Sequence, residues 1–579
     1  MEMVNIKING MPLSVPNGIS ILEAARYAGI EIPTLCYLKD INEIGACRIC
    51  MVEVKGARSL VTACVYPVNE GMEVFTNTEK VRNSRKITLE LILSTHDRKC
   101  LSCVRSGSCE LQQLCKEFGV DDETRYEGAN PHYEFDDSAA HMIRDNNKCI
   151  LCRRCVAACD MQKISVIGAN ARGFDTHISS AFDKDLADVS CISCGQCIVN
   201  CPTGALVEKD DSDKVLAAIN DPEKYVIVQT APSIRATLGE CFGMSIGTNV
   251  QGKMVAALRR LGFDKVYDTD FGADMTIMEE ANEFIDRVKN GGKLPIITSC
   301  SPGWVKFCEH YFPSLTENLS TCKSPQQMTG ALIKTWFAER EGIDPNNIVS
   351  VSVMPCVAKK FEINRDDEDA AGVPDVDISI TTRELARMIK MAQLNFARLP
   401  EEDFDPVMGV STGAATIFGA TGGVLEAALR TAADVLEGVD HDNIEYKEIR
   451  GTKGFKEAVY KVAGMDVKVA VVSGLNNANE LLKKIESGEA DYHIVEVMCC
   501  PGGCVNGGGQ PIQPSTVRSF TDIKALRAKA LYDEDAAKTL RKSHLNPVVK
   551  ECYEWMGGEP GCHKAHELLH TSYVKRDRF

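Results

Sequence analysis

The sequence predicts a multidomain protein of mixed α/β and α+β class. The chain has 579 residues, 44% of them hydrophobic and 25% charged, which is enough to bury several cores. From about residue 210 onward, apolar strand patterns alternate with helical ones, as in an α/β domain. Most of the 26 cysteines fall in short C-x2-C runs, whose members cannot be bridged to one another without strain. The cysteines therefore predict metal-binding modules, not disulfides.

The charge and the hydropathy of the sequence exclude some classes of protein. The net charge of −16, from 65 basic and 81 acidic residues, argues against a nucleic-acid surface. No basic and apolar leader precedes the first strand pattern, MVNIKING, and no apolar run approaches the length of a membrane span. We therefore expect a reducing, cytoplasmic location, where thiolates stay available to metals.

Residues 1–78 form the first predicted domain. Strand patterns VNIKING, GARSLVTACV and GMEVFTN surround one helical pattern, SILEAARYAG, and this order resembles a small ferredoxin-like β-grasp module. The cysteines in it are spaced C-x10-C-x2-C-x13-C. Four thiolates suit either a [2Fe–2S] cluster or zinc, and the β-grasp setting favours the cluster. The candidate ligands are Cys36, Cys47, Cys50 and Cys64.

Residues 79–118 form a helical, cysteine-rich second module. A His-x3-Cys-x2-Cys-x5-Cys set consists of His96, Cys100, Cys103 and Cys109. Ligand chemistry alone allows zinc here, and the neighbouring modules favour a [4Fe–4S] cluster. Cys115 follows closely and competes with His96 as the fourth ligand. The acidic segment DDETRYEGANPHYEFDDSAA then predicts an irregular linker or surface wrap.

Residues 139–209 contain the strongest motif, which occurs twice. CILCRRCVAAC and CISCGQCIVNCP both have the spacing C-x2-C-x2-C-x3-C of a bacterial-type 2[4Fe–4S] ferredoxin domain, in which the fourth cysteine of each run ligates the other cluster. Two such clusters held close together carry single electrons. The first expected set is Cys149, Cys152, Cys155 and Cys201, and the second is Cys191, Cys194, Cys197 and Cys159.

Residues 210–513 predict an α/β domain, and a helical tail over 514–579 is expected to wrap it. The strand patterns are YVIVQTAP, KLPIITSC, NIVSVSVMPC, VKVAVVSGL and YHIVEVMCC, and three of the five end in cysteine. Ligands in such domains bind where strands end. TSCSPGW, MPCVAKKFE and EVMCCPGGCVNGGG supply Cys300, Cys356, Cys500 and Cys504, four thiolates that suit a further cubane.

These three motifs resemble the active-site signatures of the [FeFe]-hydrogenases, and the resemblance runs through the whole chain. It implies reversible reduction of protons to H₂ at an H-cluster, in which a cubane is joined through Cys504 to a di-iron unit carrying CO, cyanide and azadithiolate. It assigns Lys359 to a cyanide ligand, although a lone lysine is more often solvated and Met354 or Met498 more often core. It also favours His96 over Cys115. Further cofactor-binding residues are Ala231, Pro232, Ser233, Gln326 and Gly423.

The resemblance also implies a proton path. A thiol beside the di-iron unit is followed by Glu280, Ser320 and Glu283, with Arg287 near the exit. Without the family, Glu280 and Glu283 would equally suit a solvated helical face. The family usually has paired cysteines, TSCCP, the first a proton relay and the second a cubane ligand, whereas the second position here is Ser301. Because the cluster needs a soft ligand, we assign Cys300 to the cubane and let Ser301 or a water share the relay.

Partners follow from the first two modules, which resemble the large iron–sulfur subunit of respiratory NADH dehydrogenases. We expect a hetero-oligomer with flavin- and NAD(P)-binding subunits, as in NAD(P)-linked or electron-bifurcating complexes, with ferredoxin as a second partner and maturases that supply the di-iron unit. No G-x-G-x-x-G motif opens a βαβ unit, so flavin and nicotinamide would sit on another chain. The alternatives are a free-standing ferredoxin-dependent hydrogenase and a non-catalytic H₂-sensing or iron–sulfur assembly protein.

Overall fold

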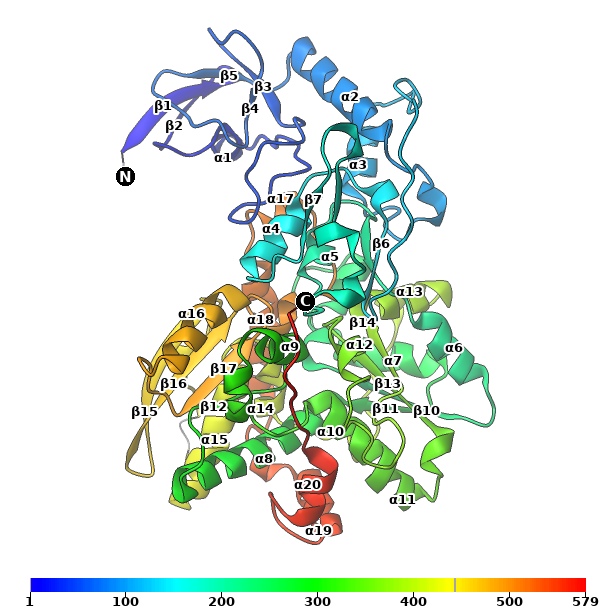
Figure 1. The fold of residues 1–579 in the computed structure, drawn as a ribbon, viewed down its shortest axis with the longest axis vertical. Helices are drawn as coiled ribbons and strands as arrows, with labels where there is room; N and C mark the ends of the chain where they lie inside the picture. Colours follow the sequence, from blue (N-terminus) through cyan, green and yellow to red (C-terminus); the bar gives the residue numbers. More distant parts are fainter. Residues whose placement is uncertain (1, 442–443, 579) are drawn as a thin grey trace. The chain divides into compact units, whose positions relative to one another are not determined.

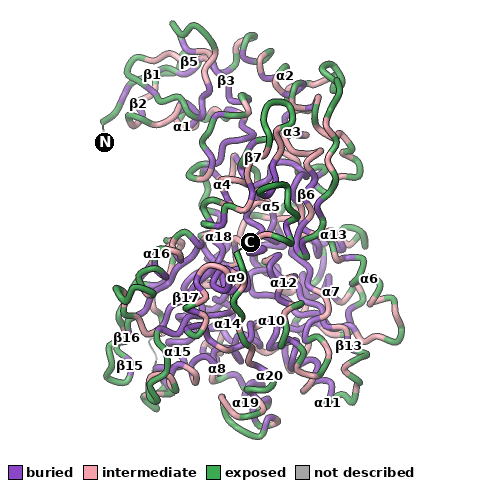
Figure 2. Tube along the Cα trace, in the orientation of Figure 1, coloured by how far each residue is buried: buried purple, intermediate pink, exposed green. Residues whose placement is uncertain are grey.

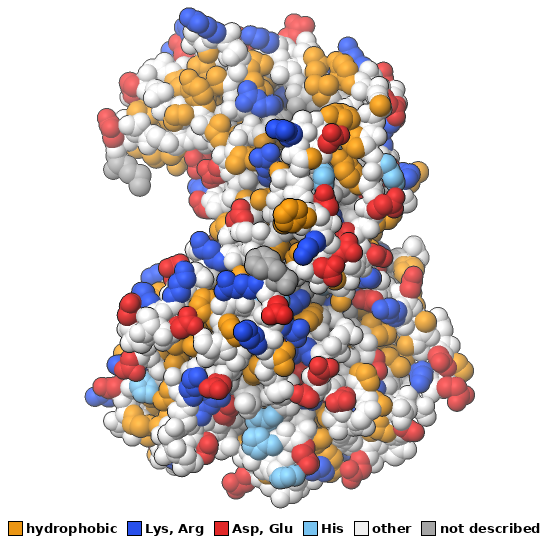
Figure 3. Space-filling model, in the orientation of Figure 1, with side chains coloured by type: hydrophobic (Ala, Val, Ile, Leu, Met, Phe, Trp, Pro, Cys, Tyr) orange, Lys and Arg blue, Asp and Glu red, His pale blue; other side chains and the backbone are white. Residues whose placement is uncertain are grey.

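The computed structural model describes residues 2–441 and 444–578, and the chain forms two compact units. The first comprises Met1–Val189, Asn200–Val207 and Ile512–Thr521; the second comprises Ser190–Val199, Glu208–Pro511 and Asp522–Phe579. No helix among the described residues is both long and apolar enough to cross a membrane. On the face drawn in Figure 3, acidic and basic side chains are interspersed.

The first unit begins with a five-stranded sheet of order β2-β1-β5-β3-β4 (Figure 1). Alternate side chains of β1 are buried, and a capping box between Ser20 and Glu23 starts α1. The three strands and the helix predicted for residues 1–78 are present, and two further strands, β2 and β3, were not predicted. The elements are β1 (Met3–Ile8), β2 (Met11–Pro16), α1 (Ile21–Tyr27), β3 (Met51–Val54), β4 (Val61–Thr62) and β5 (Glu73–Phe75).

Helices and two small ladders complete the cluster-binding part of the chain. β6 neighbours β9, and β7 pairs antiparallel with β8. Residues 121–135 contain neither helix nor strand, as the acidic composition predicted. The elements are α2 (Glu79–Leu93), α3 (Glu110–Glu117), β6 (Met142–Arg144), α4 (Arg154–Met161), β7 (Ile167–Asn170), β8 (His177–Ser180), α5 (Gln196–Asn200) and β9 (Leu206–Glu208).

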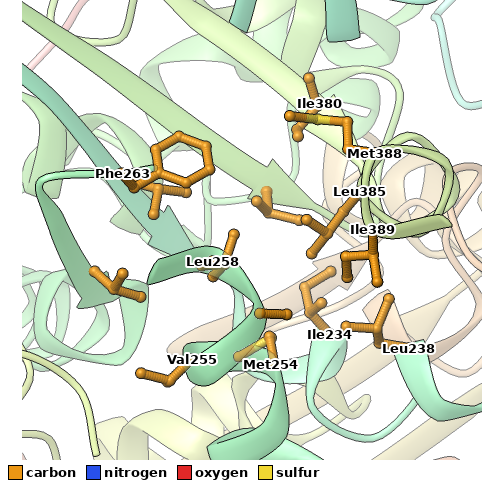
Figure 4. Close-up of a cluster of buried hydrophobic side chains, with 14 of the residues drawn as sticks. Ile234, Leu238, Met254, Val255, Leu258, Phe263, Ile380, Leu385, Met388 and Ile389 are labelled. Atoms are coloured by element: carbon orange, nitrogen blue, oxygen red, sulfur yellow. The ribbon is translucent and has the colours of Figure 1, made fainter. Parts of the chain in front are cut away.

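The second unit is built on two four-stranded sheets. The first is parallel throughout, with the order β11-β10-β13-β14. Figure 4 shows part of its apolar core, where α7 (Gln251–Leu261) and α13 (Thr382–Met391) contribute Met254, Leu258 and Leu385. Its strands are β10 (Tyr225–Thr230), β11 (Lys265–Asp268), β13 (Ile348–Met354) and β14 (Ile378–Thr381).

The second sheet has the order β12-β17-β16-β15, with only β15 antiparallel. A core of its valines and isoleucines packs with Phe284 of α8 (Thr269–Asn290) and with Leu425 and Leu429 of α15 (Gly423–Glu437). The five predicted strands of this domain are confirmed; β11, β14 and β15 are additional. The strands are β12 (Ile296–Ile297), β15 (Phe455–Val462), β16 (Met465–Ser473) and β17 (Ile494–Met498).

The tail is helical, as expected, and much of it packs on the second unit. The main chain of His570 forms an isolated antiparallel β-bridge with that of Cys322. Arg576 forms an ion pair with Glu309 of α9. Figure 2 shows that α10 and α14 lie in the buried interior of this unit. The remaining helices are α6 (Ser212–Asn220), α9 (Pro302–Tyr311), α10 (Pro325–Leu332), α11 (Ala338–Glu341), α12 (Lys359–Glu362), α14 (Gly413–Thr416), α16 (Leu475–Glu486), α17 (Ser515–Arg518), α18 (Ile523–Ala537), α19 (Pro547–Met556) and α20 (His563–Leu569).

Candidate active site and electron path

A cavity of about 70 Å³ lies where four strands of the two sheets end. β10 and β13 of the first sheet, and β12 and β17 of the second, run into the loops that line it, as expected for the carboxyl ends of parallel strands. The lining contains most of the predicted site residues: Ala231, Pro232, Ser233, Cys300, Ser301, Gln326, Met354, Cys356, Lys359, Met498, Cys500 and Cys504.

Three cysteines form one wall of the cavity. Burial raises the pKa of Cys504 to about 12 and that of Cys356 well above its usual value, and the nearby Cys500 sulfur acts in the same direction on both. Gln196 donates its amide N–H to Cys500 Sγ at 3.3 Å. Three sulfur atoms in one buried wall are suited to a soft metal cluster, which would bind them as thiolates.

Lys359 lies at the start of α12 with 8% of its surface exposed. Its ammonium group donates to Glu362 Oε2 at 2.7 Å, to Ser324 Oγ at 2.8 Å and to the Cys300 carbonyl at 3.3 Å. The lysine is therefore not a solvated surface residue. These partners hold a buried cation at the edge of the cavity.

The glycines after Cys504 serve chain packing. A Cβ on Gly507 would lie 2.2 Å from Pro355 O, and one on Gly508 would lie 2.5 Å from Cys194 O. Both of these close approaches are to main-chain atoms of the protein. Their small size lets loops from distant parts of the sequence close around the cavity.

Hydrogen bonds and an ion pair connect part of the predicted proton path. Ser320 donates to Glu283 Oε2 at 3.1 Å and also hydrogen-bonds Glu280, and Arg287 pairs with Glu283 at 2.5 Å. Glu280 is 6% exposed, and burial, followed by the charge of Glu283, raises its pKa to about 8. Its Oε1 atom is buried without a hydrogen-bond partner. A carboxylic acid in this state can hold and pass a proton near neutral pH.

One prediction about the lining needs adjustment. Gly423 is not among the lining residues; it starts α15, where its Cβ would collide with Ile417 O. Its place in the lining is taken by Gly419, and Phe418 lies beside it. Neither precedes or follows a cysteine motif, so no local signal marked them. Cys499, which we left without a role, also lines the cavity.

The four cysteines of the first module come together between β3, β4 and the loop after α1. Cys50 Sγ and Cys64 Sγ lie 3.3 Å apart, and the Cys47 N–H donates to Cys36 Sγ at 3.4 Å. Cys36, Cys50 and Cys64 are buried. The structure therefore brings together all four cysteines predicted as ligands of the first cluster.

In the second module, Cys103 lies near Cys109, and Cys115 lies near Cys100 and Cys109. Burial lowers the pKa of His96, which favours the neutral imidazole that binds metals. Its Nδ1 atom is buried without a hydrogen-bond partner. A buried, unpaired imidazole nitrogen is consistent with His96 as a ligand.

The duplicated runs share an unusual backbone. Leu151 and Arg153 in the first run, and Ser193 and Gly195 at the same positions of the second, all have φ between +53° and +67°. Left-handed residues between cysteines turn the chain so that successive side chains can reach one centre.

The fourth cysteine of the second run lies beside the first run. The sulfur of Cys201 acts on Cys149 and Cys152, as cross-ligation requires. Cys155 and Cys159 lie on α4, while Cys191 and Cys194 precede α5 and Cys197 lies within it.

Two buried side chains tie cluster-binding segments of the first unit together. Asn42 donates its amide to Cys36 O at 2.8 Å and to Cys152 O at 3.0 Å. Arg154, 1% exposed, forms two hydrogen bonds to the Glu110 carboxylate and one to Tyr37 O. No sequence motif marked Asn42 or Arg154, because their partners are distant in the chain.

The donor sets fit iron–sulfur clusters: buried and half-buried thiols, the buried His96 Nδ1 atom without a hydrogen-bond partner, and a small cavity lined by cysteines. Within the described ranges, no three His, Cys, Asp or Glu side chains are arranged to hold a single metal ion.

Family models match almost every segment of this architecture. Residues 224–508 match the iron-only hydrogenase large subunit, C-terminal domain, and residues 521–576 match the iron hydrogenase small subunit. Residues 1–79 match a 2Fe-2S cluster binding domain, residues 85–124 the NADH-ubiquinone oxidoreductase-G iron-sulfur binding region, and residues 148–212 a 4Fe-4S dicluster domain.

Relatives match over the full length. The NADP-reducing hydrogenase subunit HndD of Solidesulfovibrio fructosivorans is 50% identical, covering all of both chains. Iron hydrogenase 1 of Clostridium pasteurianum is 44% identical over 99% of this chain and all of its own. The chain belongs to the [FeFe]-hydrogenase large-subunit family. It is therefore a hydrogenase, with [2Fe–2S] and [4Fe–4S] domains preceding its catalytic domain.

Solved structures agree for the catalytic domain. A variant of apo [FeFe]-hydrogenase HydA1 from Chlamydomonas reinhardtii is 40% identical with a TM-score of 0.57, covering 64% of this chain and all of that one. Protein NAR1 of Arabidopsis thaliana is 32% identical over 66% of this chain and 84% of its own.

The small-subunit match of the tail had no counterpart in our sequence prediction, which treated the tail as a wrap of the catalytic domain.

Proposed function

We propose that this hydrogenase works as the catalytic subunit of a hetero-oligomer, exchanging electrons with a flavin- and NAD(P)-binding partner that docks on residues 1–118. The match of residues 85–124 to an iron–sulfur region of NADH-ubiquinone oxidoreductase carries this proposal. The name of the HndD relative, an NADP-reducing hydrogenase subunit, supports it. The domains are taken as 1–78, 79–118, 139–209 and 210–513, followed by the tail 514–579.

The proposed cofactors are one [2Fe–2S], three accessory [4Fe–4S] clusters and one H-cluster, held by the four cysteine groups and the cavity cysteines. When bound, the H-cluster supplies the iron chemistry that interconverts protons and H₂. Lys359 offers it a buried cation, and the apolar side chains of Met354, Met498 and Phe418 exclude water from the cavity.

The protein delivers protons through Glu280, Ser320 and Glu283. Glu280 holds a proton up to about pH 8, and Ser320 contacts both carboxyl groups. Arg287 binds Glu283 and four main-chain carbonyls near the surface, which fixes the outer carboxylate in place. Because Ser320 is fully buried, bulk water does not reach this step directly.

The docking surface is proposed around the second module. Leu101 is fully exposed and Val104 is 50% exposed, and both lie within the Cys100–Cys109 loop. Exposed apolar side chains next to an electron carrier suit a protein partner, because they add apolar area to the interface core.

The test uses the full-length chain in its native host. Leu101→Glu should lower H₂-dependent NAD(P)⁺ reduction at least tenfold and reduce co-purification of the flavoprotein, while dye-linked H₂ evolution stays unchanged. Val459→Glu, at a 60% exposed position on β15, is the matched control and should leave both activities intact.

The alternative is a free-standing enzyme that exchanges electrons with ferredoxin at the same surface. Native purification separates the two. If the chain migrates alone, without a flavin-binding partner, and exchanges electrons rapidly with ferredoxin, the hetero-oligomer hypothesis is wrong and the free-standing enzyme is the correct interpretation. The maturases that supply the di-iron unit are expected in either case.

A further inference from the structure

The catalytic cubane needs four soft ligands, and the cavity offers three unambiguous ones, Cys356, Cys500 and Cys504. Cys300, Ser301 and Cys499 also line the same cavity. Iron–sulfur clusters favour thiolates over oxygen ligands. The fourth ligand therefore has to be chosen among these three by position and chemistry.

Cys300 lies on the proton side of the cavity. After burial, the charge that most affects its thiol is Glu280, the inner carboxyl of the proposed proton path. Its carbonyl accepts from Lys359, and its side chain packs with Ala273, Phe418 and Met498. A thiol beside Glu280 is well placed to relay a proton, and ligating the cubane would remove it from that role.

Ser301 lies at the wall but carries an oxygen. Its hydroxyl accepts the main-chain N–H of Cys499 at 3.3 Å. This bond places Ser301 Oγ against the backbone of Cys499, so the two residues share one part of the wall. A serine ligand would have to lose a proton that a hydroxyl releases far less readily than a thiol.

Cys499 supplies sulfur at that same part of the wall. It is 3% exposed, and its Sγ lies 2.9 Å from the position that a Cβ on Gly303 would occupy. The absence of a side chain at Gly303 therefore makes room for this sulfur. The Cys499 thiol also hydrogen-bonds the side chains of Cys500 and Cys194. Cys499 thus lies between a cavity ligand and a cysteine of the second ferredoxin-like run.

We propose that Cys499 provides the fourth thiolate of the catalytic cubane in place of Ser301, leaving Cys300 free to relay protons. The Cys499 thiol releases its proton as Sγ binds iron, so no oxidant or reductant is needed. The assignment revises our provisional choice of Cys300. It rests on the proposed H-cluster, and it brings a cubane ligand into contact with Cys194 of the neighbouring cluster set.

The experiment measures iron before the di-iron unit is present. Full-length chain is purified anaerobically from a host without the maturases, and its iron content and Mössbauer spectrum are recorded. Wild type should hold about 18 iron atoms, and Cys499→Ala about four fewer. Cys300→Ala should keep all the iron yet give no H₂ turnover after maturation. Cys308→Ala, a buried cysteine of α9 outside the cavity lining, is the matched control and should keep both.

A rescue variant guards against misfolding. Cys499→Ala combined with Ser301→Cys restores the usual family pattern and should regain the lost cubane. If Cys499→Ala also loses the [2Fe–2S] signal, the double variant decides the question. Recovery of the catalytic cubane in the double variant supports the proposal, and failure to recover this cubane overturns the proposal. A full complement of iron in Cys499→Ala, or loss of the cubane in Cys300→Ala, also overturns it. Wild type without any catalytic-domain cubane would instead contradict the proposed function.

Discussion

In the first ferredoxin-like run, three candidate ligands follow one another within seven residues, whereas the cysteines that line the cavity lie on loops near residues 300, 356 and 500. The run is shaped by its own backbone, through left-handed residues such as Leu151 and Arg153. The cavity is shaped by two sheets, and four of their strands end at one place. Damage to the cavity should therefore spare the accessory clusters, whereas damage between accessory modules should affect several of them together.

The largest effect should come from Glu280→Gln, which keeps shape and hydrogen bonding but removes the titrating group. We expect dye-linked H₂ turnover to fall by about 10²–10⁴-fold, with the accessory clusters still reducible by EPR. In the wild type, Glu280 is protonated below about pH 8, so H₂ evolution should decline as the pH rises through that value. The decline should be absent from the residual activity of the variant.

Glu317→Gln, at an exposed carboxylate, serves as the control and should leave turnover unchanged. Wild-type turnover in Glu280→Gln would show that protons reach the cavity by another route.

Next in size is Glu110→Ala in the first unit. It leaves the buried Arg154 guanidinium without its carboxylate, which should cost about 3–5 kcal/mol of unfolding free energy. Iron should be lost from several accessory clusters at once, measured by metal content and thermal unfolding. Glu117→Ala, an exposed position of the same helix, should change stability by about 0.5 kcal/mol or less. Equal effects of the two variants would mean that the pair does not hold the modules together.

A smaller effect is expected from Gly507→Ala, because the new Cβ would lie 2.2 Å from Pro355 O. Overpacking of this kind costs about 1–3 kcal/mol. We expect weaker CO and cyanide infrared bands after maturation, with the accessory clusters intact. Gly128→Ala, in open space, should have no effect on these bands. Loss of iron from the accessory clusters in Gly507→Ala would contradict the claim that damage to the cavity spares these clusters.

The smallest effect is expected from Cys115→Ala. Although this thiol lies near Cys100 and Cys109, His96 is the proposed fourth ligand, so the iron content should stay that of the wild type. His96→Ala should instead lose or convert that cluster, visible by EPR. Iron loss in Cys115→Ala with retention in His96→Ala would reverse the assignment.

Much of the fold and of the candidate site could be predicted because the signals were local. Buried parallel strands are short apolar runs, and cluster loops are short cysteine runs, so both are visible within a few residues. β11 and β14 were missed because neither belongs to a longer apolar run, and β15 because charged residues interrupt its apolar sequence, FKEAVYKV. Gly419, Asn42 and Arg154 were missed because their roles depend on partners brought near by the tertiary fold, and these contacts leave no periodic pattern.

The single amide of Asn42 has a consequence for the speed of the enzyme. It is hydrogen-bonded to the carbonyls of Cys36 and Cys152, one from each of two cluster modules. Tunnelling between redox centres weakens steeply with every added ångström of separation. Two modules joined by a flexible linker would pass electrons only during chance encounters, at a rate set by their diffusion. Modules fastened by a shared buried side chain keep a constant gap, so the rate of this hop depends on the difference in reduction potential and not on linker motion.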